Sequence, residues 1–415
     1  MRKPRPERPL LQIIALLALG WTLFPAVAEA QTFQAALSAA RQVDSVYISK
    51  MADLKSRRMQ ASEAGTAFLP GVSVSYSKAD ATGSSVSSRS VDLTQPLFSV
   101  DKYLQFTSRN PLATQANAQL RLAENDLSLR VFNAMADIVR ARESLRAIQV
   151  QIDGLEAQYR RAQRMRELGQ GTVTEVSDFE VRLAVAEGNR LNLKATLDAA
   201  RRNFTLVTHL VPDVAGMDVV APATTNNTDE AAVFGIVRVF DHAVVAARQN
   251  LELARINSRR SWAKYLPTVS AVAGYGSVNG LKSTSSSRVG ILFNAPLGAT
   301  PYFEQQNAAI ELDRAQESLR AAEDAAVNDA ANLLTALRSL DAEIRVRQRA
   351  IQAAQQAVEG NLKSYQGGVK SNIDVVTSFQ TLADTEVALV NARLNIAQAN
   401  LRLSFIENLT AEIAP

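Results

Sequence analysis

The sequence predicts a mixed α+β membrane protein in which long antiparallel coiled-coil helices are interrupted by β-hairpins. Three observations lead to this class: an N-terminal export signal, an internal repeat, and heptad spacing of apolar residues over very long segments. The two halves repeat with an offset of 197 residues, which superposes "LGQGTVTEV" on "YQGGVKSNI". We therefore expect a first structural repeat at 31–211, a linker at 212–228 and a second repeat at 229–415.

The N-terminus is typical of a cleavable export signal. A basic segment, "MRKPRPERP", precedes an apolar stretch, and Ala28 and Ala30 fit the small-x-small cleavage pattern. We expect residues 1–30 to be removed, and an uncleaved signal anchor is the alternative. No later stretch of about 18 apolar residues occurs, so no further transmembrane helix is expected.

The composition argues against several kinds of chemistry. The chain has no cysteine, so disulfides, thiolate metal sites and a lipid-anchored cysteine are not expected. The net charge is +4 and no basic cluster is interleaved with aromatic residues, so no nucleic acid partner is expected. The two histidines, His209 and His242, have no neighbouring metal ligands. Glu175 and Asp178 have the spacing of a solvated helix face, so neither a catalytic site nor a cofactor is expected.

Each repeat is expected to contain a very long helix, a glycine turn and a second long helix. Over 131–162, apolar or small residues step by three and four without a miss, which is the spacing of a coiled-coil seam. A continuous helix from about 111 to 168 would extend about 85 Å. Such a helix must run beside neighbours as the wall of a tube. The segment "RNP" at 109–111 predicts a late helix start or a kink.

Each repeat also contains a predicted β-hairpin, at about 70–98 and 267–297. Each of the four predicted strands is close to the length of about 9 to 11 residues that crosses a bilayer as a tilted strand. Within each strand, apolar residues alternate with small or polar ones. Prolines at both ends are expected to be hinges between helix and strand, namely Pro70, Pro96, Pro267 and Pro296. The alternating residues expected to face lipid are Val72, Val74, Tyr76, Val91, Leu93, Val269, Ala271, Ala273, Tyr275, Val289, Ile291 and Phe293.

The strand count bears on oligomeric state. Two soluble hairpins, each lying on a helix, are an alternative interpretation of these runs. The export signal, the equal hairpin lengths and helices too long to act as lids favour the membrane. Four strands cannot close a barrel, since the smallest membrane barrels have about eight, and open sheet edges do not occur in lipid. Several copies must therefore pool their hairpins.

The order and spacing of these features resemble the TolC-like outer-membrane efflux protein family over essentially the whole mature chain. The resemblance rests on the repeat, on "FLPGVSVSY" and "YLPTVSAVAGY", on "QPLF", and on the turns in "RELGQGTVTEVSDFEV" and "YQGGVKSNIDVVTSFQTL". It implies a homotrimer whose twelve pooled strands form a β-barrel in outer-membrane lipid, with a helical tunnel in the periplasm. It implies a passive exit duct of a tripartite efflux or type I secretion system, working with a periplasmic adaptor and an ABC or proton-driven inner-membrane pump.

The resemblance also implies roles for residues of the two glycine turns, taken here as Gly171 and Gly368. The turn residues expected to contact the adaptor are Gln170, Gly171, Thr172, Gly367, Gly368 and Val369.

The same resemblance implies a constriction and closing ties near the second turn. Asp374 occupies the position of an inward aspartate, while Thr377 replaces a second one. An acid at the start of a helix, favoured by the helix dipole, is the alternative interpretation of Asp374. The residues in the positions of the closing ties are Tyr365, Lys370 in place of an arginine, Ser177 in place of an aspartate, and its neighbour Asp178.

Two other functional classes remain in competition with a duct. One is a secreted or periplasmic structural coiled-coil protein with soluble hairpins. The other is an exported enzyme, for which the chain lacks an evident catalytic constellation.

Overall fold

The computed structural model describes residues 32–81, 84–218, 230–279, 283–295 and 300–411. The expected signal peptide at 1–30 and Pro296 lie outside these residues. The elements in chain order are α1 (Phe33–Val43), α2 (Ser45–Gly65), β1 (Gly71–Ala81), β2 (Ser84–Phe98), α3 (Val100–Thr107), α4 (Arg109–Glu167), α5 (Val173–Thr208), α6 (Glu230–Phe240), α7 (His242–Ala263), β3 (Thr268–Asn279), β4 (Thr284–Asn294), α8 (Thr300–Gln366) and α9 (Asn372–Ala411).

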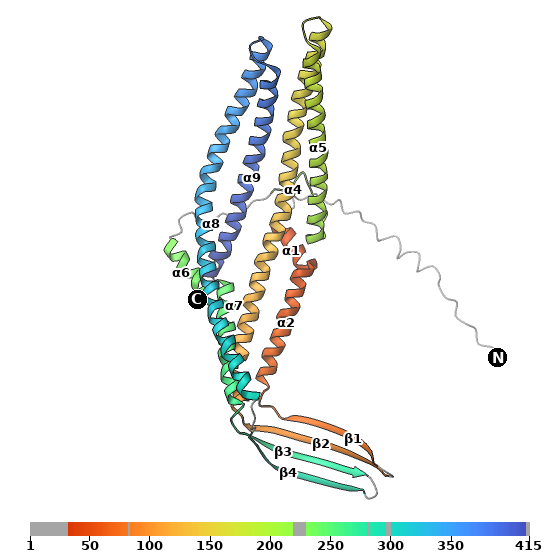
Figure 1. Ribbon diagram of the computed structural model, residues 1–415, viewed down its shortest axis with the longest axis vertical. Coiled ribbons are helices and arrows are strands. Elements are labelled where there is room, and N and C mark those ends of the chain that lie inside the picture. The colour runs from red at the N-terminus through yellow and green to blue at the C-terminus, as the bar shows by residue number, and fades with distance from the viewer. Residues whose placement is uncertain (1–31, 82–83, 219–229, 280–282, 296–299, 412–415) are drawn as a thin grey trace, which may run out of the picture.

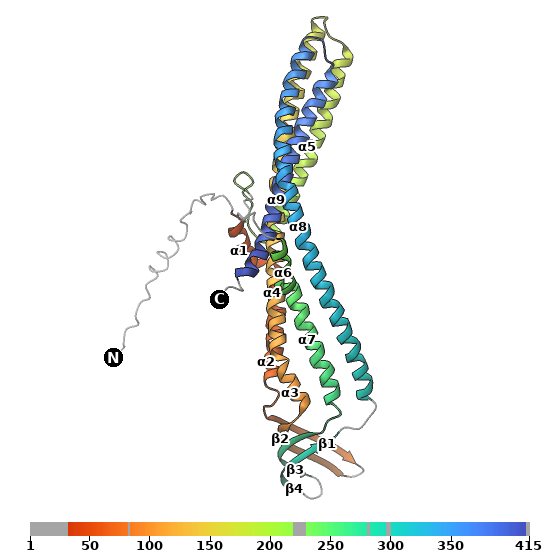
Figure 2. The same cartoon turned by 90° about the vertical axis from the view of Figure 1, so that its left-hand side faces the viewer.

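The molecule is a long helical rod with a β-sheet at one end (Figure 1). Two helical hairpins, α4/α5 and α8/α9, run side by side to the opposite end, which we call the tip. The helices α4 and α8 have 59 and 67 residues. At about 1.5 Å per residue they extend about 90 and 100 Å. The short helices α1 and α6 lie beside the middle of the rod (Figure 2).

The core follows the predicted seam of α4. Leu127, Val131 and Ile138 are fully buried against α1, the end of α5 and α9. The segment after α5 is held on the same helix, because Arg142 donates hydrogen bonds to the carbonyl oxygens of Val214, Ala215 and Met217. This arrangement joins the first repeat to the second around one helix. Among the described residues, no helix has both the length and the apolar composition needed to cross a membrane.

The helix after β2 is broken at Ser108. Helix α3 ends at Thr107 and α4 begins at Arg109, so Pro111 is the third residue of α4. A proline in the first turn is tolerated because the N–H it lacks would have no partner within the helix. The interruption predicted at 109–111 is therefore one residue earlier, and α4 continues through Pro111.

The four strands form one antiparallel sheet in the order β1-β2-β3-β4. Pairing of β2 with β3 joins the two predicted hairpins. Residues directly opposite each other in an antiparallel pair share a face. Leu93 lies opposite both Val72 and Ala273, and Ala273 lies opposite Val289. The same register places all twelve residues that we assigned to the lipid side on one face of the sheet.

The prolines near the strands occupy different positions. Pro70 and Pro267 each directly precede a strand, β1 or β3. Pro96 lies inside β2 opposite Ser270, beside a register shift, rather than between strand and helix. The expected hinge at Pro96 is therefore wrong. A proline inside a strand is accommodated at such an irregularity because it has no N–H to donate to the ladder.

The opposite face of the sheet is polar. Serine hydroxyls pair across β1 and β2, with Ser75 and Ser90 2.8 Å apart. Arg288 of β4 donates to Asp92 of β2 at 2.6 Å and spans β3 above Gly274. A Cβ at Gly274 would collide with both side chains of this pair. Glycine at this position therefore allows an ion pair between strands that are not neighbours.

A buried ion pair fixes α1 and α2 to α4. The Asp44 carboxylate caps α2 by accepting from the Tyr47 N–H at 2.7 Å, and Arg130 donates to both its oxygens, at 2.6 and 3.0 Å. Burial alone would raise the pKa of Asp44. The hydrogen bonds from Arg130 and Tyr47 outweigh it and leave the pKa below its usual range.

We expect Asp44→Ala to lower the free energy of unfolding by about 3 kcal/mol, since it removes a helix cap and one partner of a buried pair. Because the pKa of Asp44 is lowered on folding, its contribution is present above the unfolded pKa of about 3.9 and is lost as pH falls through the folded pKa. Thermal unfolding of the detergent-purified protein at pH 7 and at about pH 3 measures both effects. Asp53→Ala, at an exposed pair 3.6 Å from Lys50, is the control; an equal loss in both variants would contradict the prediction.

Candidate functional site

The two turns at the tip have the same backbone structure. Gly169 and Gly368 both have φ of 73°, in the left-handed region that glycine adopts without strain. The N–H of the next residue reaches back in each turn, from Gln170 to the Met165 carbonyl at 2.8 Å and from Val369 to Ser364 at 2.9 Å. These are Schellman-type helix ends.

The residue equivalent to Gly368 is therefore Gly169. Gly171 lies within the first turn, as expected, but two residues beyond the left-handed position. Near the tip the two repeats thus correspond with an offset of 199 residues rather than 197, since α5 begins at Val173 and α9 at Asn372. Counting from the correct glycine changes which acid of α5 corresponds to Asp374.

The acid equivalent to Asp374 is Glu175, and each is the third residue of its helix. Ser177, which the sequence places in a closing tie, is exposed. Thr377 is exposed as well, on α9.

Asp374 contacts the start of its own helix. Its carboxylate accepts from the Ser371 N–H at 3.0 Å and from the Ser371 hydroxyl at 2.9 Å, and Lys370 Nζ is 3.7 Å away. These hydrogen bonds, with the Lys370 charge, lower the pKa of Asp374. This is the geometry of the alternative interpretation, an acid that caps a helix. Lys370 likewise contacts Asp374 rather than the other hairpin.

Tyr365 joins the two hairpins. From the end of α8, its hydroxyl donates to Glu175 of α5 at 3.3 Å. Its ring lies edge-on to Phe179, with centroids 6.3 Å apart, and the Arg161 guanidinium lies 5.5 Å from the ring centroid. The pKa of Tyr365 is raised, mainly because the side chain is partly buried and also because the negative charge of Glu175 lies beside it. The sequence predicts only a solvated face for Glu175, whose role depends on a neighbour 190 positions away.

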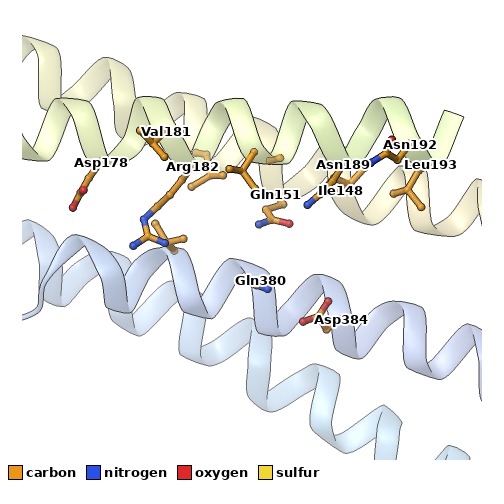
Figure 3. Close-up of a pocket in the computed structure, with 14 residues that line it drawn as sticks. Ile148, Gln151, Asp178, Val181, Arg182, Asn189, Asn192, Leu193, Gln380 and Asp384 are labelled. Carbon is orange, nitrogen blue, oxygen red and sulfur yellow. The ribbon is translucent and has the colours of Figure 1, made fainter. Parts of the chain in front are cut away.

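A second polar contact lies beside the first. Asn372 at the start of α9 donates to Asp178 of α5 at 3.2 Å. Asp178 also lines a groove of about 660 Å³ between the two hairpins. Figure 3 shows Arg182 extending from α5 toward α9, with Gln380 and Asp384 on the opposite wall. Charged and amide side chains therefore line the groove together with apolar ones such as Val181 and Leu193.

Below the tip, a glycine allows close packing of α4 on α9. A Cβ at Gly154 would lie 2.6 Å from the ring of Phe379, too close for van der Waals contact. Phe379 packs with Val375 and Leu382 in the core of the α8/α9 hairpin. The absence of a side chain at Gly154 thus sets how closely the hairpins approach.

The turns expose apolar side chains to solvent. Leu168 is 70% exposed and Val369 82% exposed. Val173, the first residue of α5, and Ile373, the second residue of α9, are also exposed. Large apolar residues gathered at one exposed end are typical of a contact surface for another protein. The sequence places Val369 in such a contact; the exposure of the other three is evident only from the structure.

Comparison with known proteins extends these observations. The family profile described as "Outer membrane efflux protein" matches residues 237–408. The outer membrane protein TolC of Salmonella enteritidis is 23% identical over 93% of this chain and 84% of its own length. The outer membrane efflux protein BepC of Brucella suis is 24% identical over 94% of this chain and 88% of its own length. The solved structure of VceC from Vibrio cholerae has a TM-score of 0.74 at 20% identity, covering 91% of this chain and 95% of that one.

The fold is one of long helical hairpins joined to one sheet with a single apolar face. Residues 237–408 match the outer membrane efflux protein family, and the chain as a whole is TolC-like in sequence and in fold.

We expect Tyr365→Phe to loosen the junction between the hairpins, because it removes the hydroxyl that bonds Glu175 and keeps the ring that contacts Phe179 and Arg161. A hydrogen bond to a charged group contributes about 1.5–3 kcal/mol, so the equilibrium between joined and separated hairpins should shift at least tenfold. The measurement is channel conductance in planar bilayers, which should rise in Tyr365→Phe. Tyr47→Phe removes a comparable bond to Glu124, far from the tip, and should leave conductance unchanged; a similar rise in both variants would refute the role of Tyr365.

We expect Gly154→Leu to force α4 and α9 apart at Phe379, at a cost of about 1–3 kcal/mol from overpacking. The expected result is a lower unfolding temperature together with higher conductance. Gly188→Leu is the matched control, because a Cβ there meets no atom within 4 Å. Equal effects of the two substitutions would show that the close approach at Gly154 is not a constraint on the tip.

Proposed function

We propose that the chain is the outer-membrane exit duct of a tripartite efflux or type I secretion system. The observation that carries this proposal is the sheet, with twelve alternating residues on one face, attached to helices of about 90 and 100 Å. The sheet lies in the outer membrane and the helices extend into the periplasm. The duct is passive, because energy is supplied by an inner-membrane pump, either ABC-type or proton-driven.

Assembly follows from the edges of the sheet. Strands β1 and β4 each pair on one side only within a protomer, and unpaired strand edges are not tolerated in lipid. Three protomers would pair β4 of one with β1 of the next and close a twelve-stranded barrel. The polar face with Ser75, Ser90 and the Asp92–Arg288 pair then lines the lumen. The hairpins of three protomers form the tunnel wall.

The tip is the contact for the periplasmic adaptor and the gate of the tunnel. The exposed apolar residues of the two turns support an adaptor contact, and the ties from Tyr365 to Glu175 and from Asn372 to Asp178 support a closing role. Three copies of Asp374 near the axis would favour cations.

The names of the relatives point to two kinds of cargo. The proteases secretion protein PrtF of Dickeya chrysanthemi is 23% identical over 55% of this chain, and efflux proteins such as BepC match over more of it. Proteins and small molecules therefore both remain within the proposed function.

Purification and bilayer recording test the proposal. The membrane fraction should yield a detergent-soluble trimer that dissociates on heating, and the trimer should form discrete channels in planar bilayers. A secreted structural coiled-coil protein with soluble hairpins would instead be recovered as a monomer without detergent and would form no channels. That result would overturn the proposal.

A further inference from the structure

The apolar face of the sheet ends in two cationic side chains. Side chains alternate between faces along a strand, so Tyr76 and Lys78 share the face of Val74 on β1. Arg89 of β2 lies opposite Tyr76 and therefore faces the same way. Both Lys78 and Arg89 are exposed. The cations thus lie at the end of the apolar face, toward the end of β1 and the start of β2, which Figure 1 shows directed away from the helices.

Their height above the helices matches the edge of a hydrocarbon layer. Ser277 lies opposite Arg89, eight residues along β3 from Val269 in the lowest apolar row. Eight residues span about 26 Å along a strand, or about 20 Å along the membrane normal at a tilt of about 40°. The apolar band of outer-membrane barrels is about 25 Å tall. Arg89 and Lys78 therefore lie where hydrocarbon gives way to headgroups, on the side farther from the periplasmic tunnel.

The contacts of Arg89 leave its guanidinium available. It lies 5.7 Å from the centroid of the Tyr76 ring, and within the described part of the chain it makes no ion pair. Arg288, on the opposite face of the same sheet, is paired with Asp92. A guanidinium without a carboxylate, stacked on a tyrosine at a lipid boundary, has the geometry to hold a phosphate through two N–H groups. Tyrosine itself prefers this boundary.

We propose that Arg89 of each protomer binds a phosphate group of the lipid in the outer leaflet, where Lys78 adds a second positive charge. The inference rests on the proposed function, because it requires this face to lie in the outer membrane. The partner is a phosphorylated glycolipid headgroup, since a cation pair at the outer rim of the apolar band faces that headgroup layer. The bound lipid fixes the vertical position of the barrel.

The experiment measures lipid retained on the detergent-purified trimer by native mass spectrometry. The probes are lipid A with two phosphates and the same lipid after enzymatic dephosphorylation. The wild-type trimer should retain the phosphorylated form preferentially. Lys78→Gln/Arg89→Gln should weaken its retention by at least about tenfold, because the charge-assisted contact of Arg89 and the neighbouring positive charge of Lys78 are both lost. Lys194→Gln/Arg202→Gln removes the same charges from exposed positions on α5 and should retain lipid as the wild type does.

Channel recording on the same samples separates the two proposals. If the double strand variant still conducts and binds both forms of lipid A as the wild type does, the phosphate site is refuted while the duct remains. Equal retention of both forms by the wild type would also refute it. Failure of every sample to form a conducting trimer would instead overturn the proposed function on which the inference rests.

Discussion

Backbone hydrogen bonding at the edges of the sheet is the constraint on which the rest of the structure depends. Within one protomer, β1 and β4 each have an unpaired side, and lipid offers no hydrogen-bond partner to those groups. A sheet of four strands with one apolar face is therefore incomplete by itself. The internal repeat supplies two hairpins and two pairs of long helices per chain, so whatever closes the sheet also brings the helical hairpins together.

The tip is held differently from the rest of the rod. Along most of their length the hairpins pack through buried aliphatic side chains of the α4 core, whose contacts are numerous and not directional. At the tip, two polar contacts, Tyr365 with Glu175 and Asn372 with Asp178, lie beside the single ring contact of Tyr365 with Phe179. Few, polar, partly exposed contacts are weaker than a hydrophobic core. Polar contacts of this kind therefore join the hairpins at the end that we propose to be the gate.

Much of this fold could be predicted because it is periodic. Heptad spacing predicts the long helices, and alternation over two residues predicts the strands with their apolar side. The misplaced features depend on single backbone angles. Gly169 and Gly171 are both candidates for the left-handed position, and only φ distinguishes them. That choice determines whether Ser177 or Glu175 corresponds to Asp374. Pairing of β2 with β3 joins segments too distant for any local pattern to predict.

That distant pairing has a consequence for the order in which the chain can mature. Val91 of β2 pairs with Tyr275 of β3, so the first hairpin must wait for a partner synthesised and exported much later. Contacts so far apart in sequence form slowly because the intervening loop must first be closed. Until then both sides of the first hairpin expose strand edges and apolar side chains to water. During export the first hairpin is therefore prone to aggregation. This stage ends only when the second half of the chain arrives and β3 pairs with β2.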